Sequence, residues 1–446
     1  MPHRDVPPPG TGGRSRGRTR GWTRGWTRAA LAVAVVVVLA VVGLVAWRAL
    51  TPTTRLQEAM GLAPEDATRF SWTDWDGVRR ELDAGVGADS SAEDVDAFLA
   101  AAFDGDLSSM SALGTSAGVM QEELGFSPAT LSWELLAQSG AGAVEVMKVD
   151  DAVDLDAVAE HLAELGWTEP EEEDGVWVGG PDVLAGVGSR LTPELQHVAL
   201  LADEGLVLTS DQAPFLEQVL EGGGAPDDLV DLAASLEEPL AAAVYDGAYA
   251  CEQLAMSQAD DDAQAEADQL VEAAGEVHPL TGFAMGVLPG GDVRAVMQVE
   301  DADDAPGDAE ARARLAAGPA PGQGGEFADR FSVDRAGSEG REVVLDLRPV
   351  RGSYVLSDLT SGPVLFATCW SPGRSGGTSV LRLARGDAEE TVDLVLRQVV
   401  VGLARGDDQR GGELHLAQEV AVLESHVELV VHRHPPVGLA RWATRP

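Results

Sequence analysis

Ser116 has the strongest claim to chemistry of any residue in this sequence. It lies in GTSAG, residues 114–118, which matches G-x-S-x-G, the turn that exposes a serine nucleophile between a strand and a helix. Catalysis by such a serine needs an apolar strand before it, and residues 106–113 (DLSSMSAL) do not have that pattern. We therefore interpret GTSAG as a loop of small residues and keep a serine hydrolase that uses Ser116 as the alternative hypothesis.

Residue types that bind metals or cofactors do not converge in the sequence. His161, His197 and His278 are isolated, with no H-E-x-x-H motif and no paired cysteines beside them. The acidic runs 260–262 and 301–304 lack the spacing of an EF-hand, so we interpret both as solvated loops. We expect no catalytic residue, no metal ligand and no cofactor.

Two tryptophans form the best candidate contact surface for a glycan or a peptide. Trp72 and Trp75 lie close together beside Asp74 and Asp76, and indole faces stack well on sugars and peptides. Burial in the core is the preferred interpretation, because large aromatic side chains are mostly buried in folded domains.

The N-terminal segment predicts how the rest of the chain is placed. Ala29 to Ala46 run without a charge and would form a helix of about 27 Å, which suits a bilayer core. Arginines precede it, which favours a basic cytoplasmic tail (residues 1–28), a transmembrane helix (29–50) and export of the remainder. A cleaved signal peptide is the competing interpretation, but Trp47 and Arg48 follow the segment without an A-x-A-like site.

The exported part is very acidic. Residues 51–369 contain 14 Lys and Arg against 63 Asp and Glu. Such a surface repels nucleic acid and anionic headgroups, so we expect no nucleic-acid partner. A solvated acidic surface is preferred over a dedicated acidic binding face.

Cys251 and Cys369 are the only cysteines in the sequence. Both lie on the side predicted to be exported, where disulfides form and persist, so we expect a bridge between them. The alternative is two separate buried thiols. A bridge would close a loop of more than 100 residues and stabilise the fold by about 4 to 5 kcal/mol on the chain-entropy model.

The order of predicted elements suggests two α+β halves with antiparallel sheets. Alternation predicts a strand over 143–149, and helical periodicity follows over 155–165. A similar order begins again near residue 240, with paired strands over 283–288 and 293–299. We place the halves at residues 51–235 and 236–369, since about 320 residues exceed what one core usually serves. Residues 370–446 are nearly neutral and form a tail of uncertain order.

Three segments carry a resemblance to a family. Residues 62–75 (LAPEDATRFSWTDW), 125–130 (GFSPAT) and 362–369 (GPVLFATC) resemble uncharacterised membrane-anchored extracytoplasmic proteins of high-GC Gram-positive bacteria. The resemblance implies an exported α+β domain and supplies no catalytic residue.

The sequence therefore predicts a single-pass cell-membrane protein with a signal-anchor and an acidic extracytoplasmic domain. We expect a non-enzymatic role in binding or cell-envelope assembly, with the membrane as one partner through Ala29 to Ala46. An envelope protein or a glycan is the expected class of second partner. An exported hydrolase using Ser116 stays the alternative.

Overall fold

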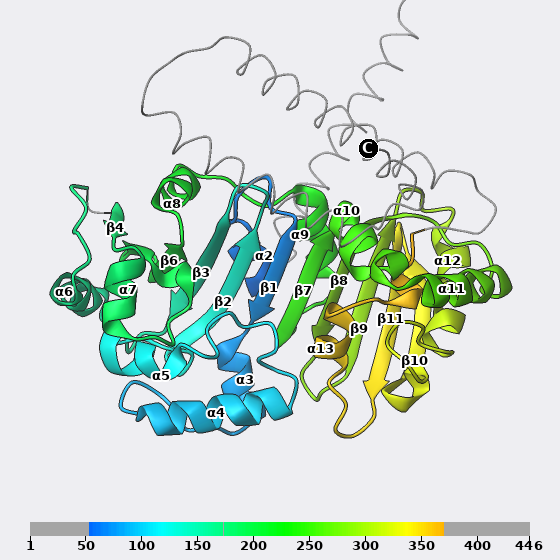
Figure 1. The fold of residues 1–446 in the computed structure, drawn as a ribbon, viewed down its shortest axis with the longest axis horizontal. Coiled ribbons are helices and arrows are strands. Elements are labelled where there is room, and N and C mark those ends of the chain that lie inside the picture. The colour runs from blue at the N-terminus through cyan, green and yellow to red at the C-terminus, as the bar shows by residue number, and fades with distance from the viewer. Residues whose placement is uncertain (1–52, 173, 370–446) are drawn as a thin grey trace, which may run out of the picture. The chain divides into compact units, whose positions relative to one another are not determined.

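The computed structural model describes residues 53–172 and 174–369 (Figure 1). The predicted basic tail (1–28), the predicted transmembrane helix (29–50) and the C-terminal tail (370–446) lie outside the described residues. Across the described ranges, no helix is both long enough and apolar enough to cross a bilayer.

Eleven strands form one antiparallel sheet in the order β10-β11-β9-β8-β7-β1-β2-β3-β6-β5-β4. The strands are β1 (Arg69–Thr73), β2 (Leu131–Gln138), β3 (Ala143–Val149), β4 (Val176–Val178), β5 (His197–Leu201), β6 (Leu206–Ser210), β7 (Ala241–Asp246), β8 (Leu280–Val287), β9 (Val293–Val299), β10 (Phe331–Glu339) and β11 (Glu342–Pro349).

Helices cover both faces of this sheet. The α-helices are α2 (Arg55–Met60), α3 (Trp75–Glu81), α4 (Ala92–Asp104), α5 (Ala117–Val119), α6 (Leu155–Leu165), α7 (Pro181–Val187), α8 (Ala213–Leu220), α9 (Asp227–Ala234), α10 (Gly247–Tyr249), α11 (Asp261–Ala274), α12 (Ala305–Ala316) and α13 (Val355–Thr360). Shorter 3-10 or π-helical turns are η1 (Met120–Leu124), η2 (Pro193–Leu195), η3 (Ala250–Leu254), η4 (Met256–Gln258), η5 (Phe327–Asp329) and η6 (Leu365–Ala367).

The prediction of an α+β fold with antiparallel pairing is confirmed, but the number of sheets is corrected. We expected separate sheets in the two halves, and the described chain instead forms one sheet because β1 pairs with β7 at its centre (Figure 1). Below, the first half means the described residues up to 235 and the second half means residues 236–369.

The two halves are related by a local two-fold axis through the Ser71–Ala243 pair of β1 and β7. Asp74 N donates to Leu240 O over 2.8 Å, and the related Asp246 N donates to Thr68 O over 2.9 Å. From this axis outward, β1-β2-β3-β6-β5 repeats the order of β7-β8-β9-β11-β10. The repeat that element order suggested therefore extends to strand register.

Alternation along the strands divides the interior into two cores. Phe70, Trp72 and Val244 point to the face covered by α2, α8 and α9. Met147 and Tyr245 point to the opposite face, which α3, α4, α6, α11 and α12 cover. Because the central strands are buried on both faces, a polar side chain on them enters a core rather than solvent.

Candidate functional site

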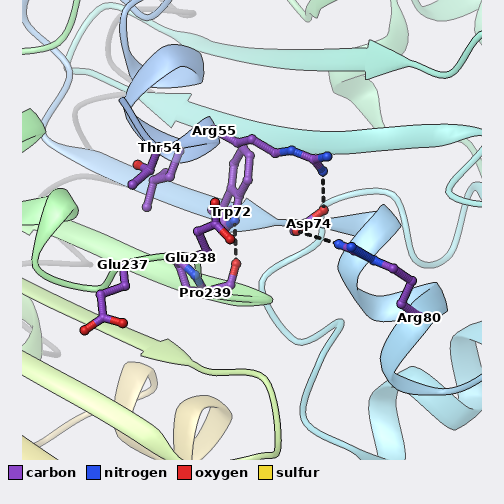
Figure 2. A pocket seen from close by; sticks show the side chains of 9 residues that line it. Thr54, Arg55, Trp72, Asp74, Arg80, Glu237, Glu238 and Pro239 are labelled. Carbon is purple, nitrogen blue, oxygen red and sulfur yellow. Dashed lines mark hydrogen bonds and ion pairs between the residues drawn. The ribbon is translucent and has the colours of Figure 1, made fainter. Parts of the chain in front are cut away.

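A small pocket opens where β1 ends, between α2 and the start of α3 (Figure 2). Its centre is Asp74, the N-cap of α3, whose Oδ1 accepts from Gly77 N over 3.0 Å. Arg55 Nη1 lies 3.1 Å from the same carboxylate, and Arg80 Nη2 lies 3.8 Å away. Burial raises the pKa of Asp74, while the Gly77 hydrogen bond and the two guanidinium groups act to lower it.

The rest of the pocket lining combines the apolar ring of Trp72 with the acidic side chains of Glu237 and Glu238. Trp72 is 2% exposed and donates from its indole N–H to Pro239 O over 3.0 Å. Glu237 and Glu238 also line the pocket (Figure 2). Glu237 Oε1 binds Arg294 Nη1 at 2.7 Å. The cavity volume of about 100 Å³ is below the 300–1,000 Å³ typical of metabolite pockets, so this pocket suits water or one small group.

Both candidate contact tryptophans belong to the core, which is the interpretation that the sequence favoured. Trp72 lies 5.5 Å from the Trp133 ring, and Trp75 is fully buried with its indole N–H donating to Glu134 Oε2 over 3.0 Å. Neither indole face is presented to solvent for a glycan. The carboxylates beside them act locally: Asp74 caps α3, and Asp76 pairs with Arg79 at 2.7 Å.

The hydroxyl of Ser116 is used within the fold. It donates to Arg190 O over 3.0 Å and accepts from Thr192 N over 2.8 Å, and the residue is fully buried. A nucleophilic serine must instead give its proton to a base and face a substrate. The loop interpretation of GTSAG is right only up to Ser116, because Ala117 and Gly118 already belong to α5 and Ser116 is its N-cap residue. The hydrogen bonds of the buried hydroxyl do not support attack by Ser116.

His278 forms a network in the second half that sequence reasoning missed. Its Nδ1 lies 2.7 Å from Asp308 Oδ1, and Asp308 Oδ2 accepts from Arg312 Nε over 2.9 Å. Arg312 is fully buried and also donates to Phe366 O and Thr368 O. Among the described residues, no group of three or more His, Cys, Asp and Glu side chains is placed to hold a metal ion. The network therefore fastens the end of the second half to α12.

Cys251 and Cys369 are joined by a disulfide, with their Cα atoms 5.6 Å apart. Cys251 lies in η3, shortly after β7, and Cys369 lies two residues after η6. The disulfide encloses almost the whole second half in one covalent loop.

A second group that the sequence did not single out lies in the core of the first half. Glu134 on β2 and Glu145 on β3 are 1% and 0% exposed. Strand register places Thr73 opposite Glu134 and Thr209 opposite Glu145, all four on one face of the sheet. Neither carboxylate oxygen of Glu145 has a hydrogen-bond partner, and the hydroxyls of both threonines lack one too. We call these four side chains the polar patch.

The signal for the polar patch was present in the sequence. A strand that alternates with an inward glutamate, as in LSWELLAQ and AVEVMKV, indicates a buried charge when the strand is central. The signal is readable only once both strands are known to lie inside a sheet covered on both faces.

Comparisons with known proteins give a distant structural likeness. A scan against protein-family models gave no match, and a search of curated proteins gave none. Crystal form I of TP0453 matches with a TM-score of 0.32 and 8% identity, covering 69% of this chain and 98% of that one. Crystal form III of TP0453 matches with a TM-score of 0.33 and 9% identity, covering 68% and 98%. A likeness at this level carries no argument about function.

Proposed function

We propose that the chain is a single-pass membrane protein that holds its α+β domain outside the cytoplasmic membrane for binding or envelope assembly. Ala29 to Ala46 would span the bilayer with the arginine-rich tail in the cytoplasm. The Cys251–Cys369 disulfide supports export, because such bonds persist in oxidising compartments. The resemblance to membrane-anchored extracytoplasmic proteins of high-GC Gram-positive bacteria supports the same placement.

One observation carries the binding role: the domain directs nearly all its acidic side chains to solvent. Residues 51–369 hold 63 Asp and Glu, and the buried ones among the described residues are Asp74, Asp106, Glu134, Glu145 and Asp308. The resulting negative surface would steer a partner with basic groups and repel anionic polymers. Although composition alone favours a solvated surface that keeps the domain soluble, we infer that the same acidic surface selects a partner, an envelope protein with a basic surface.

The binding role is tested on intact cells that produce the full chain. A zero-length reagent that couples carboxylates to amines should join the domain to a discrete partner, and the yield should fall at high salt because surface charges are screened. The control is the same anchor fused to an unrelated acidic domain. A partner shared with that control, or a yield that salt leaves unchanged, would overturn the role.

The topology is tested with an epitope tag placed before Met1. Protease added to intact cells should digest the domain and leave the tag on a membrane-embedded fragment. Loss of the tag from the mature chain would show that the segment is a cleaved signal peptide. Protection of the domain would show that it is cytoplasmic.

The hydrolase alternative is tested with a fluorophosphonate probe, which labels activated serines. The full chain should stay unlabelled, because the Ser116 hydroxyl is buried and donates to Arg190 O. Labelling that disappears in Ser116→Ala would restore the hydrolase.

A further inference from the structure

Two members of the polar patch, Glu145 and Thr209, lie on strands contacted by a short segment, residues 190–195, which we call the cover. Within the cover, η2 contacts β3 and β6, the strands that carry Glu145 and Thr209. Leu191 and Leu195 anchor the cover in the core at 8% and 1% exposure. Ser116 fastens it through hydrogen bonds with Arg190 O and Thr192 N. The cover is therefore held by two apolar anchors, by the Ser116 hydroxyl and by an exposed ion pair between Arg190 and Asp96 of α4, 3.8 Å apart.

Glu145 has no group nearby that would stabilise its charged form. Both of its oxygens lack a donor, and the charges that act on it are those of Glu134 on β2 and Glu194 on η2, both acidic. Burial raises the pKa of Glu145 well above its ordinary value, and these two neighbours raise it further. An ionised carboxylate here would be buried and uncompensated, which is costly.

Glu134 is in a different position. Burial raises its pKa to about 7, while hydrogen bonds from Ser111, Trp75 and the backbone N–H of Ala112 act to lower it. The two carboxyls interact, so they titrate as a pair, and the first negative charge belongs on the member that has donors. Glu145 is thus the carboxyl that keeps its proton.

We propose that the cover is a proton-controlled latch, closed over Glu145 while that carboxyl is protonated and opened when the proton is lost. Opening hydrates the carboxylate and moves Glu194 away from it, so the open state favours the charged form. Because opening then releases a proton from Glu145, the opening equilibrium should rise with pH, by at most about tenfold per pH unit. Ser116 would set how tightly the latch is held.

The experiment is amide hydrogen exchange on the full chain between pH 6 and pH 8, corrected for the intrinsic pH dependence of exchange. The Thr192 amide and its neighbours in the cover should lose protection as the pH rises, by at most about a hundredfold over these two pH units. In Glu145→Gln the protection should not depend on pH. Glu204→Gln is the matched control, because it removes an exposed carboxyl from the turn between β5 and β6 and should keep the wild-type slope.

A second variant keeps the proposal testable if Glu145→Gln does not fold. Ser116→Ala should raise opening about fivefold or more at every pH, since it removes two hydrogen bonds, and should leave the slope unchanged. Opening of this variant is followed at the Leu195 amide, which donates to Thr192 O, because the Thr192 amide itself loses its acceptor. Protection of the wild-type cover that does not vary with pH would overturn the latch. The same holds if Glu145→Gln retains the wild-type slope.

Discussion

The two halves place different chemistry at positions that the local two-fold axis makes equivalent. Thr73, Glu134, Glu145 and Thr209 form the polar patch in the first half. Strand register assigns their counterparts as Tyr245, Phe283, Ala295 and Leu345 in the second half, which are all buried hydrophobic residues. Since the same strand order accommodates an apolar layer, the fold does not require the buried acids.

In the second half, the buried charged groups and the cysteines instead hold the C-terminal residues of the domain in place. The Cys251–Cys369 disulfide and the fully paired Asp308–Arg312 ion pair both fasten the residues that follow α13. The contrast teaches that one half has its buried charges paired, whereas the other keeps an acid without a partner. A paired group contributes to stability, and an unpaired one costs stability unless it serves another purpose.

The largest expected effect is loss of the covalent closure. Replacing both cysteines (Cys251→Ser with Cys369→Ser) should lower the free energy of unfolding by about 4 to 5 kcal/mol, because a loop of this length gains much entropy when unfolded. Denaturant unfolding of the oxidised chain measures it. Reduction of the wild-type chain is the control and should give a similar loss. If the variant and the oxidised protein were equally stable, the disulfide would not contribute to the stability of the second half.

The ion pair of the second half should come next. Arg312→Leu should cost about 3 kcal/mol or more, since Asp308 would keep a buried charge while Phe366 O and Thr368 O lose a donor. Arg341→Leu is the control, because its ion pair with Asp228 is exposed and should contribute less than about 1 kcal/mol. Similar costs for the two variants would mean that burial does not strengthen the interaction.

A substitution that makes the first half resemble the second should raise, rather than lower, the free energy of unfolding. Glu145→Leu should stabilise the protein by about 2 kcal/mol at neutral pH by removing a buried acid without donors. The folded wild type holds a proton that the unfolded chain releases above about pH 4.5, so wild-type stability falls as pH rises. Part of that fall belongs to Glu134, between its ordinary pKa and about 7. Stability curves against pH should therefore be flatter for the variant, and parallel curves would exclude Glu145 as the titrating group.

The smallest expected effects concern two helix caps that the local two-fold axis makes equivalent, Asp74 and Asp246. Asp74→Ala and Asp246→Ala should each cost about 1 kcal/mol, because each carboxylate caps the helix after its strand through Gly77 N or Tyr249 N. Added salt should reduce the cost for Asp74 alone, since Arg55 and Arg80 face that carboxylate. The measurement is denaturant unfolding at low and high salt. Equal salt dependence would show that the arginines contribute nothing.

Local periodicity predicted three elements to the residue and a fourth approximately, since the strand expected over 283–288 is β8 (Leu280–Val287). The expected strand over 143–149 is β3, the expected helix over 155–165 is α6, and the expected strand over 293–299 is β9. These predictions are correct because alternation and helical spacing are properties of a single segment of sequence. Periodicity is less informative near residue 365, where the apolar run Val364–Ala367 contains the 3-10 turn η6 and Phe366 O accepts a hydrogen bond from Arg312.

What the sequence could not reveal depends on long-range pairing. The single sheet rests on β1 meeting β7, which lie far apart in the chain and carry no local mark of their partnership. The polar patch likewise depends on which strands become neighbours, so Glu145 and Thr209 were not connected beforehand. Asp74 was noticed beside the tryptophans, but its role as a cap facing Arg55 needed the structure.

The disulfide also determines how the domain would respond to mechanical load. Its two cysteines are separated by 118 positions, so a force entering at Cys369 passes directly to η3 and bypasses the chain between them. Full extension of those residues would lengthen the protein by roughly 400 Å, and the disulfide prevents this extension. A chain pulled between its N-terminal end and Cys369 could therefore lengthen only through the residues before Cys251, because those between the two cysteines stay closed in the loop.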